Sequence, residues 1–142
     1  MIARMALVRI LLIEDNPGDV RLMEEYLPRN LPFELDISHC ARLREAQAVL
    51  QEGRIFELIL LDLFLPDSMG FPTFEAVREH AGGIPIVVLS GWEDQDQVSR
   101  ALAGGARDYI NKSNLDGLKF VRILREAVKA SGPHASLPDR AV

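Results

Sequence analysis

The chain has 142 residues, and its 16 Lys and Arg against 21 Asp and Glu give a formal net charge of −5. This length predicts one domain, and 48% hydrophobic with 26% charged residues is typical of a globular protein rather than a disordered one. The single cysteine, Cys40, excludes an intramolecular disulfide framework and a multi-cysteine zinc site. The acidic balance argues against a general nucleic-acid-binding surface.

The apolar run nearest the N-terminus, residues 10–13, stops at Glu14 and Asp15. It is far shorter than the roughly 20 residues that cross a bilayer, and it lacks the small-residue cleavage site of a secretory signal. We therefore expect a cytoplasmic protein that does not contact a membrane.

Short apolar runs alternate with amphipathic stretches along the chain, as in proteins whose strands alternate with helices. The apolar runs predict strands over residues 7–13, 33–40, 58–61, 84–89 and 107–111. Helical spacing predicts helices over residues 18–27, 43–50, 94–103 and 115–129, with a short helix around 74–77. Asn16 before Pro17 is typical of a helix start. The segment 63–70, which contains Pro66 and Gly70, is expected to be a loop.

Five strand–helix units in this order predict an α/β protein with a doubly wound, five-stranded parallel sheet. Strands without a polar face need cover on both sides, and right-handed crossovers leave few topologies. The alternating segment 33–40 is expected to be an exposed or edge strand. Residues 1–130 are expected to form the domain. Residues 131–142, which hold two prolines and a glycine, are expected to form a flexible C-terminal tail.

Polar side chains stand where four of the predicted strands end. Glu14 and Asp15 follow the first strand, Asp62 the third, Ser90 the fourth and Lys112 the fifth. Ligands of doubly wound sheets bind beyond the carboxyl ends of the strands, so these five side chains are expected to meet at one edge.

The chemistry of this set points to phosphate and a metal ion. Three carboxylates at one edge repel one another unless a cation is present, and hard oxygen ligands of this kind suit Mg²⁺. Asp62 is then a candidate nucleophile, because a carboxylate can accept a phosphoryl group as an aspartyl phosphate. Lys112 and the metal would neutralise the transferring oxygens.

With these residues in order, the chain resembles the receiver domain of two-component response regulators over about residues 7–129. The matching segments are Glu14-Asp15, Asp62 in LLDLFLPDSMG, Ser90-Gly91 after PIVVL, and Tyr109 to Lys112 in YINK. The opening EDNPGDVRLMEEYL is also similar to single-domain receivers that partner phytochrome-type kinases, and to receivers in hybrid kinases. The resemblance implies a flavodoxin-like (βα)5 fold.

The resemblance also implies which residues bind the metal and the phosphoryl group. Asp62 would be the phosphoacceptor, served by a sensor histidine kinase or a phosphotransfer protein. Asp15 and Asp62 would bind Mg²⁺ directly together with the backbone carbonyl of Phe64, and Glu14 would act through a bound water.

The resemblance implies that the remaining matching residues respond to phosphorylation of Asp62. Ser90 and Lys112 would each contact a phosphoryl oxygen, and Tyr109 would change rotamer with Ser90 on activation. Ser113 stands where the family usually has proline after the lysine, often with a cis peptide, and Gly91 stands where alanine is commoner. Bulky Phe64 and Trp92 are expected to flank the site and restrict access to it.

These inferences together predict a single-domain response regulator that is phosphorylated on Asp62 in a Mg²⁺-dependent reaction. It would catalyse only its own phosphorylation and dephosphorylation, and would switch a surface that binds a downstream protein target. Residues 131–142 are too few for an output domain. A homodimer through residues 94–129 is possible on the family's pattern, without direct contact to nucleic acid.

Other interpretations stay open. The chain is alternatively a receiver module of a larger or hybrid phosphorelay system, or a receiver that binds proteins without phosphorylation. A metal-dependent phosphatase of the haloacid-dehalogenase type carries an aspartate two residues after its nucleophile, where this chain has Phe64. A nucleotide- or flavin-binding protein is disfavoured, because neither G-x-G-x-x-G nor G-x-x-x-x-G-K-[ST] occurs.

Overall fold

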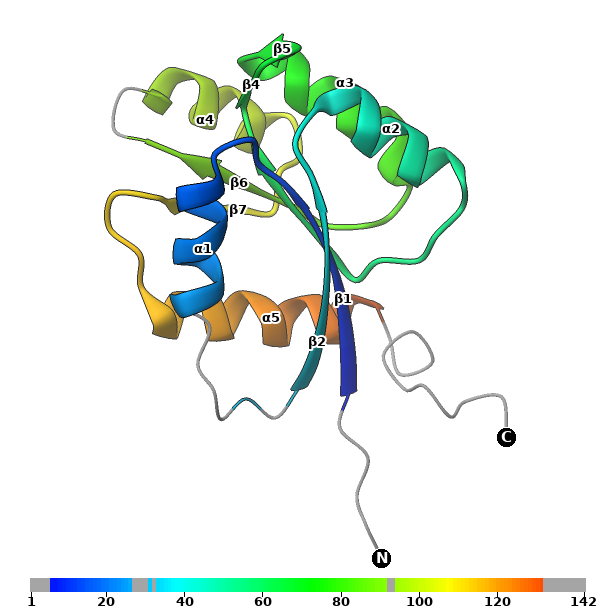
Figure 1. Cartoon of the computed structure of the whole chain (residues 1–142), viewed down its shortest axis with the longest axis vertical. Helices are drawn as coiled ribbons and strands as arrows, with labels where there is room; N and C mark the ends of the chain where they lie inside the picture. Colours follow the sequence, from blue (N-terminus) through cyan, green and yellow to red (C-terminus); the bar gives the residue numbers. More distant parts are fainter. Residues whose placement is uncertain (1–5, 27–30, 32, 92–93, 132–142) are drawn as a thin grey trace, which may run out of the picture.

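The central sheet has five parallel strands in the order β2-β1-β3-β6-β7 (Figure 1). The computed structural model of the protein describes residues 6–26, 31, 33–91 and 94–131. The strands are β1 (Ala6–Ile13), β2 (Phe33–Cys40), β3 (Leu58–Asp62), β6 (Ile86–Ser90) and β7 (Asp108–Asn111). Both the doubly wound parallel sheet and the edge position of the strand over residues 33–40 are confirmed.

Helices cover both faces of this sheet (Figure 1). One layer holds α1 (Pro17–Tyr26) and α5 (Gly117–Ser131). The other holds α2 (Leu43–Gln51), α3 (Phe71–Ala81) and α4 (Gln95–Ala103). Successive strand residues point to opposite faces, so Leu11 packs toward α2–α4 while Leu12 packs toward α1 and α5. This double cover explains why the inner strands β1, β3 and β6 are apolar at most positions, with polar residues at Arg9 and at the strand ends Asp62 and Ser90.

The segment after β3 differs from the prediction. The expected loop over residues 63–70 contains an antiparallel hairpin of β4 (Phe64–Leu65) and β5 (Ser68–Met69). Two-residue strands are too short to show a hydrophobic period, so the sequence pattern could not reveal them. The hairpin closes at Gly70, whose amide donates to the carbonyl of Leu63 at 2.7 Å and whose φ is 80°.

The first amides of α1 and α2 donate hydrogen bonds to side chains, in one case a neighbouring residue and in the other a distant one. Asn16 Oδ1 accepts from the amides of Gly18 and Asp19 at 2.8 and 3.3 Å, which confirms the predicted start of α1. Asp67, in the hairpin, accepts from the first two amides of α2, those of Leu43 and Arg44, at 2.9 and 3.1 Å. This contact ties the hairpin to a helix 23 and 24 residues earlier in the chain.

Two expectations concern residues that the structure does not describe. The predicted tail and Trp92 fall on residues 132–142 and 92, outside the described residues, and α5 itself runs to Ser131. No helix within the described ranges is long and apolar enough to cross a membrane.

Candidate functional site

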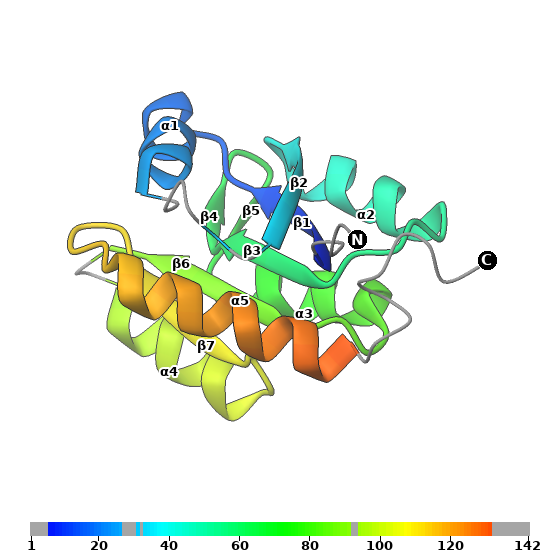
Figure 2. The same cartoon turned by 90° about the horizontal axis from the view of Figure 1, so that it is seen from below.

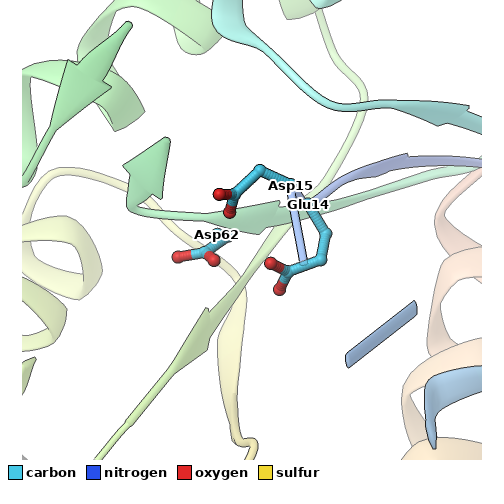
Figure 3. A group of neighbouring side chains, drawn as sticks. All are labelled: Glu14, Asp15 and Asp62. Atoms are coloured by element: carbon cyan, nitrogen blue, oxygen red, sulfur yellow. The ribbon is translucent and has the colours of Figure 1, made fainter. Parts of the chain in front are cut away.

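The carboxyl ends of the strands bring the predicted acidic residues together. Glu14 and Asp15 follow β1, and Asp62 is the last residue of β3, which pairs with β1. Carboxylate oxygens of all three lie within 4.8 Å of one another (Figure 3). The sequence-based expectation of an acidic cluster at this edge therefore matches the geometry.

The cluster is mostly buried, although Asp15 is exposed. Glu14 has no exposed surface, and Asp62 is 5% exposed. The amide of Phe64 donates to Asp62 Oδ1 at 2.9 Å, which fixes the orientation of that carboxylate. Burial raises the pKa of Glu14 to about 8, and a hydrogen bond to the Asp62 carboxyl adds to this, while Lys112 lowers it.

Lys112 supplies the positive charge of the site. Its Nζ lies 2.9 Å from Glu14 Oε2, 2.9 Å from Asp19 Oδ2 and 3.0 Å from Asp62 Oδ2. Its backbone amide donates to the carbonyl of Ser90 at 2.7 Å, which anchors the lysine to the end of β6. Burial lowers the pKa of Lys112, but hydrogen bonds to Asp19 and Glu14 and the charge of Asp62 hold it above its ordinary value.

Asp19 is a member of the site that the sequence analysis missed. It lies in the first turn of α1 and reaches Lys112, which is 93 residues later. Both line an open pocket of about 500 Å³ beside Asp62, together with Phe64, Gly91, Asp94 and Ser113. The available signal was an acidic residue in the first turn after the Glu14-Asp15 pair, which by itself is ordinary for a helix start.

Ser90 has a buried hydroxyl without a partner. The residue is 1% exposed, and within the described chain its Oγ makes no hydrogen bond. A buried hydroxyl left unpaired costs free energy, so an oxygen-rich ligand at this edge would satisfy it. This orphaned donor, the carboxylate cluster and the ammonium fit a bound phosphoryl group with Mg²⁺.

The aromatic residue of the predicted switch, Tyr109, is half-buried and packs against the core between the sheet and α2–α4. The Nζ of Lys119 lies 4.3 Å from the centre of its ring. No described peptide bond is cis, and Lys112 reaches Asp62 with Ser113 following it. The role of the Phe64 carbonyl as a metal ligand stays a prediction.

The family model of the response regulator receiver domain matches residues 10–125. The cell cycle transcriptional regulator CtrA of Caulobacter vibrioides is 34% identical over 128 residues, which are 90% of this chain and 53% of that protein. The two-component response regulator ARR18 of Arabidopsis thaliana is 32% identical over 106 residues, 74% of this chain and 16% of its own length. This chain thus spans about half of such curated relatives, or less.

Solved structures agree with the sequence relatives. A receiver domain protein from Clostridium thermocellum superposes with a TM-score of 0.74 at 16% identity, covering 87% of this chain and 96% of that one. The phosphorylated cyanobacterial phytochrome response regulator RcpA is 28% identical, with a TM-score of 0.66 over 94% of this chain and 100% of that one. The chain belongs to the family of response regulator receiver domains.

Proposed function

We propose that this chain is a phosphorylation-controlled receiver in which Asp62 takes a phosphoryl group from a histidine kinase or a phosphotransfer protein. The observation that carries the proposal is the contact of Lys112 with Asp62 and Glu14 at 3.0 and 2.9 Å. It joins the ends of three strands into one charged site. RcpA, a relative with this fold, is named as phosphorylated.

The transfer needs a nucleophile and a way to neutralise charge. A carboxylate oxygen of Asp62 bonds to phosphorus as the P–N bond of a phosphohistidine breaks, and the bonding pair stays on the imidazole nitrogen, which then takes a proton. Lys112 and the hydroxyl of Ser90 stand at the same edge to bind the phosphoryl oxygens. Each supplies a donor where negative charge gathers.

Asp15 and Asp62, with the carbonyl of Phe64, are proposed to hold Mg²⁺ directly, and Glu14 through a water. The ion would supply charge neutralisation for the phosphoryl oxygens. The support is the oxygen chemistry of the cluster and its spread of 4.8 Å. Phe64 has no proton to donate at the position where a dehalogenase-type phosphatase carries its general acid, so turnover of external phosphate esters is not expected.

Phosphorylation is proposed to reach a protein-binding surface through Ser90 and Tyr109. Movement of Ser90 toward a phosphoryl oxygen would make room for the Tyr109 ring. Tyr109 lies on β7, which α4 and α5 flank (Figure 2). This surface, within residues 94–129, is the proposed contact for a downstream protein target or for a second copy of the chain.

Beryllofluoride, an anion that mimics a phosphoryl group, tests the proposal. With Mg²⁺ it should shift the backbone amide signals of Ser90 and Lys112, and Asp62→Asn should abolish the shifts. Asp36→Asn removes an exposed aspartate of β2 and should leave them unchanged. Shifts that persist in Asp62→Asn, or that never occur in the wild type, would contradict the proposal.

A further inference from the structure

All three N–H donors of the Lys112 ammonium are already used in hydrogen bonds. A lysine has three N–H donors, and here they meet three carboxylates, those of Glu14, Asp19 and Asp62, at 2.9 to 3.0 Å. A phosphoryl oxygen can therefore bind this ammonium only when one carboxylate gives up its hydrogen bond. Which carboxylate yields decides how easily the phosphoryl group enters.

Asp19 differs from the other two partners. Glu14 and Asp62 belong to the cluster whose oxygens lie within 4.8 Å. Each has a second carboxylate oxygen, so it could take part in a cation site and still accept from Lys112. Asp19 stands outside that cluster, on the first turn of α1, with its side chain 25% exposed. Its contact with Lys112 is therefore the one that an incoming phosphoryl oxygen can most readily replace, because the Asp19 carboxylate can turn to solvent.

The position of Asp19 also places its charge near an incoming phosphoryl group. Two acceptors of one ammonium lie about 5 Å apart, so a phosphoryl oxygen on Lys112 would sit about that far from the Asp19 carboxylate. Coulomb repulsion between two unit charges at about 5 Å, even screened as in bulk water, amounts to roughly fourfold in an equilibrium constant. Because the pocket is open to solvent, added salt should reduce this effect.

We propose that Asp19 is a positioning residue that competes with the phosphoryl group for Lys112 and thereby restrains phosphorylation of Asp62 by anionic donors. The inference rests on the proposed function of Asp62. With acetyl phosphate, the Asp62 oxygen bonds to phosphorus as the P–O bond to acetate breaks, and acetate leaves with the bonding pair. Asp19 makes and breaks no bond in this step and acts through Lys112 and through its charge.

Asp19→Asn tests the inference, because it keeps the side-chain size and an oxygen that can accept from Lys112 while removing the charge. With acetyl phosphate and Mg²⁺, the phosphorylation rate should rise roughly fourfold or more. Beryllofluoride should bind tighter by a similar factor. Asp19→Glu, which restores the charge, should return both towards wild type. Glu24→Gln removes an exposed charge from the same helix and should change neither.

A second donor separates an electrostatic role from a structural one. Phosphoramidate carries less negative charge than acetyl phosphate, so Asp19→Asn should increase the rate of phosphorylation by phosphoramidate less than the rate with acetyl phosphate. A general change in the fold would alter the two rates alike. A rate for Asp19→Asn with acetyl phosphate at or below that of wild type overturns the inference alone, provided that wild type is phosphorylated and Asp62→Asn is not. If wild type takes up no phosphate, the proposed function fails and the inference fails with it.

Discussion

At the scale of single residues, the buried hydroxyl of Ser90 gives the clearest support for the proposed ligand site. This hydroxyl lacks a hydrogen-bond partner within the described residues. Ser90→Ala should therefore raise the free energy of unfolding, by about 1 kcal/mol, since an unpaired buried donor is removed. The same change should weaken beryllofluoride binding by about tenfold, since a hydrogen bond to an anion is lost.

Denaturant unfolding and a beryllofluoride titration of the same samples measure both effects of Ser90→Ala. The matched control is Ser99→Ala on α4, whose side chain is exposed and should affect neither quantity. A fall in stability on Ser90→Ala would show that the hydroxyl already has a stabilising partner.

Glu14 makes the site sensitive to pH. Burial, with the hydrogen bond to Asp62, raises its pKa from 4.5 to about 8 in the protein without a metal. The folded chain then holds a proton that the unfolded chain releases, so this group's contribution to the free energy of unfolding falls as pH rises between those values. The proposed Mg²⁺ site needs an ionised Glu14, so the affinity for Mg²⁺ should increase with pH up to about 8 and then level off.

Titrations of Mg²⁺ between about pH 6 and pH 9 test the role of Glu14. Glu14→Gln should flatten the pH dependence, because glutamine does not titrate in this range. An affinity for Mg²⁺ that is already independent of pH in the wild type would mean that Glu14 is ionised throughout.

At the scale of elements, the hairpin after β3 connects the site to α2. Asp67 accepts from the Leu43 and Arg44 amides, and although burial raises its pKa, these hydrogen bonds hold it below its ordinary value. Asp67→Ala should lower the free energy of unfolding by about 1 kcal/mol, as for other lost helix caps.

Because the folded pKa of Asp67 is lowered, its stabilising effect is present above the ordinary pKa of aspartate and is lost as pH falls through the folded value. The difference in stability between wild type and Asp67→Ala should therefore shrink in acid. Asp36→Ala, on an exposed position of β2, is the control. An equal difference at all pH values would contradict the capping role.

Gly70 ends the same hairpin in a conformation that suits glycine. Its φ is 80°, and a Cβ there would lie 2.7 Å from Gln97 Oε1, which accepts from the amide of Phe71 at the start of α3. Gly70→Ala should cost about 1–3 kcal/mol, because a φ of 80° with a ψ of −157° is a backbone conformation that essentially only glycine adopts. Gly83→Ala, where no atom lies within 4 Å of the added Cβ, should cost much less. Thermal unfolding of both variants measures these losses of stability. Equal losses in Gly70→Ala and Gly83→Ala would show that the backbone conformation of Gly70 does not require glycine.

The elements were predictable where the signal is local. Apolar runs identified the inner strands because their residues are buried on both faces, and the polar residues at the strand ends identified the acidic cluster. The hairpin and the contact of Asp67 with α2 were missed, because they depend on how distant segments pack. Asp19 was missed for the same reason, since its partner lies 93 residues away.

At the scale of the whole molecule, the parallel sheet is what joins these groups. Glu14, Asp62 and Lys112 are distant in sequence. Taken singly, each could be an ordinary polar residue where a strand ends. Because parallel strands end at the same edge, the fold turns separate residues into one charged pocket. The fold class was therefore enough to predict the cluster, although the three-way contact of Lys112 required the structure.

The most direct measurement is the intact mass of the chain after incubation with acetyl phosphate. We predict the addition of one phosphoryl group, dependent on Mg²⁺, carried by the peptide that contains Asp62 and lost in Asp62→Asn. Asp36→Asn should gain the same mass as wild type. A wild-type chain that gains no mass, gains it equally when Mg²⁺ is chelated, or carries it on another residue would contradict the account.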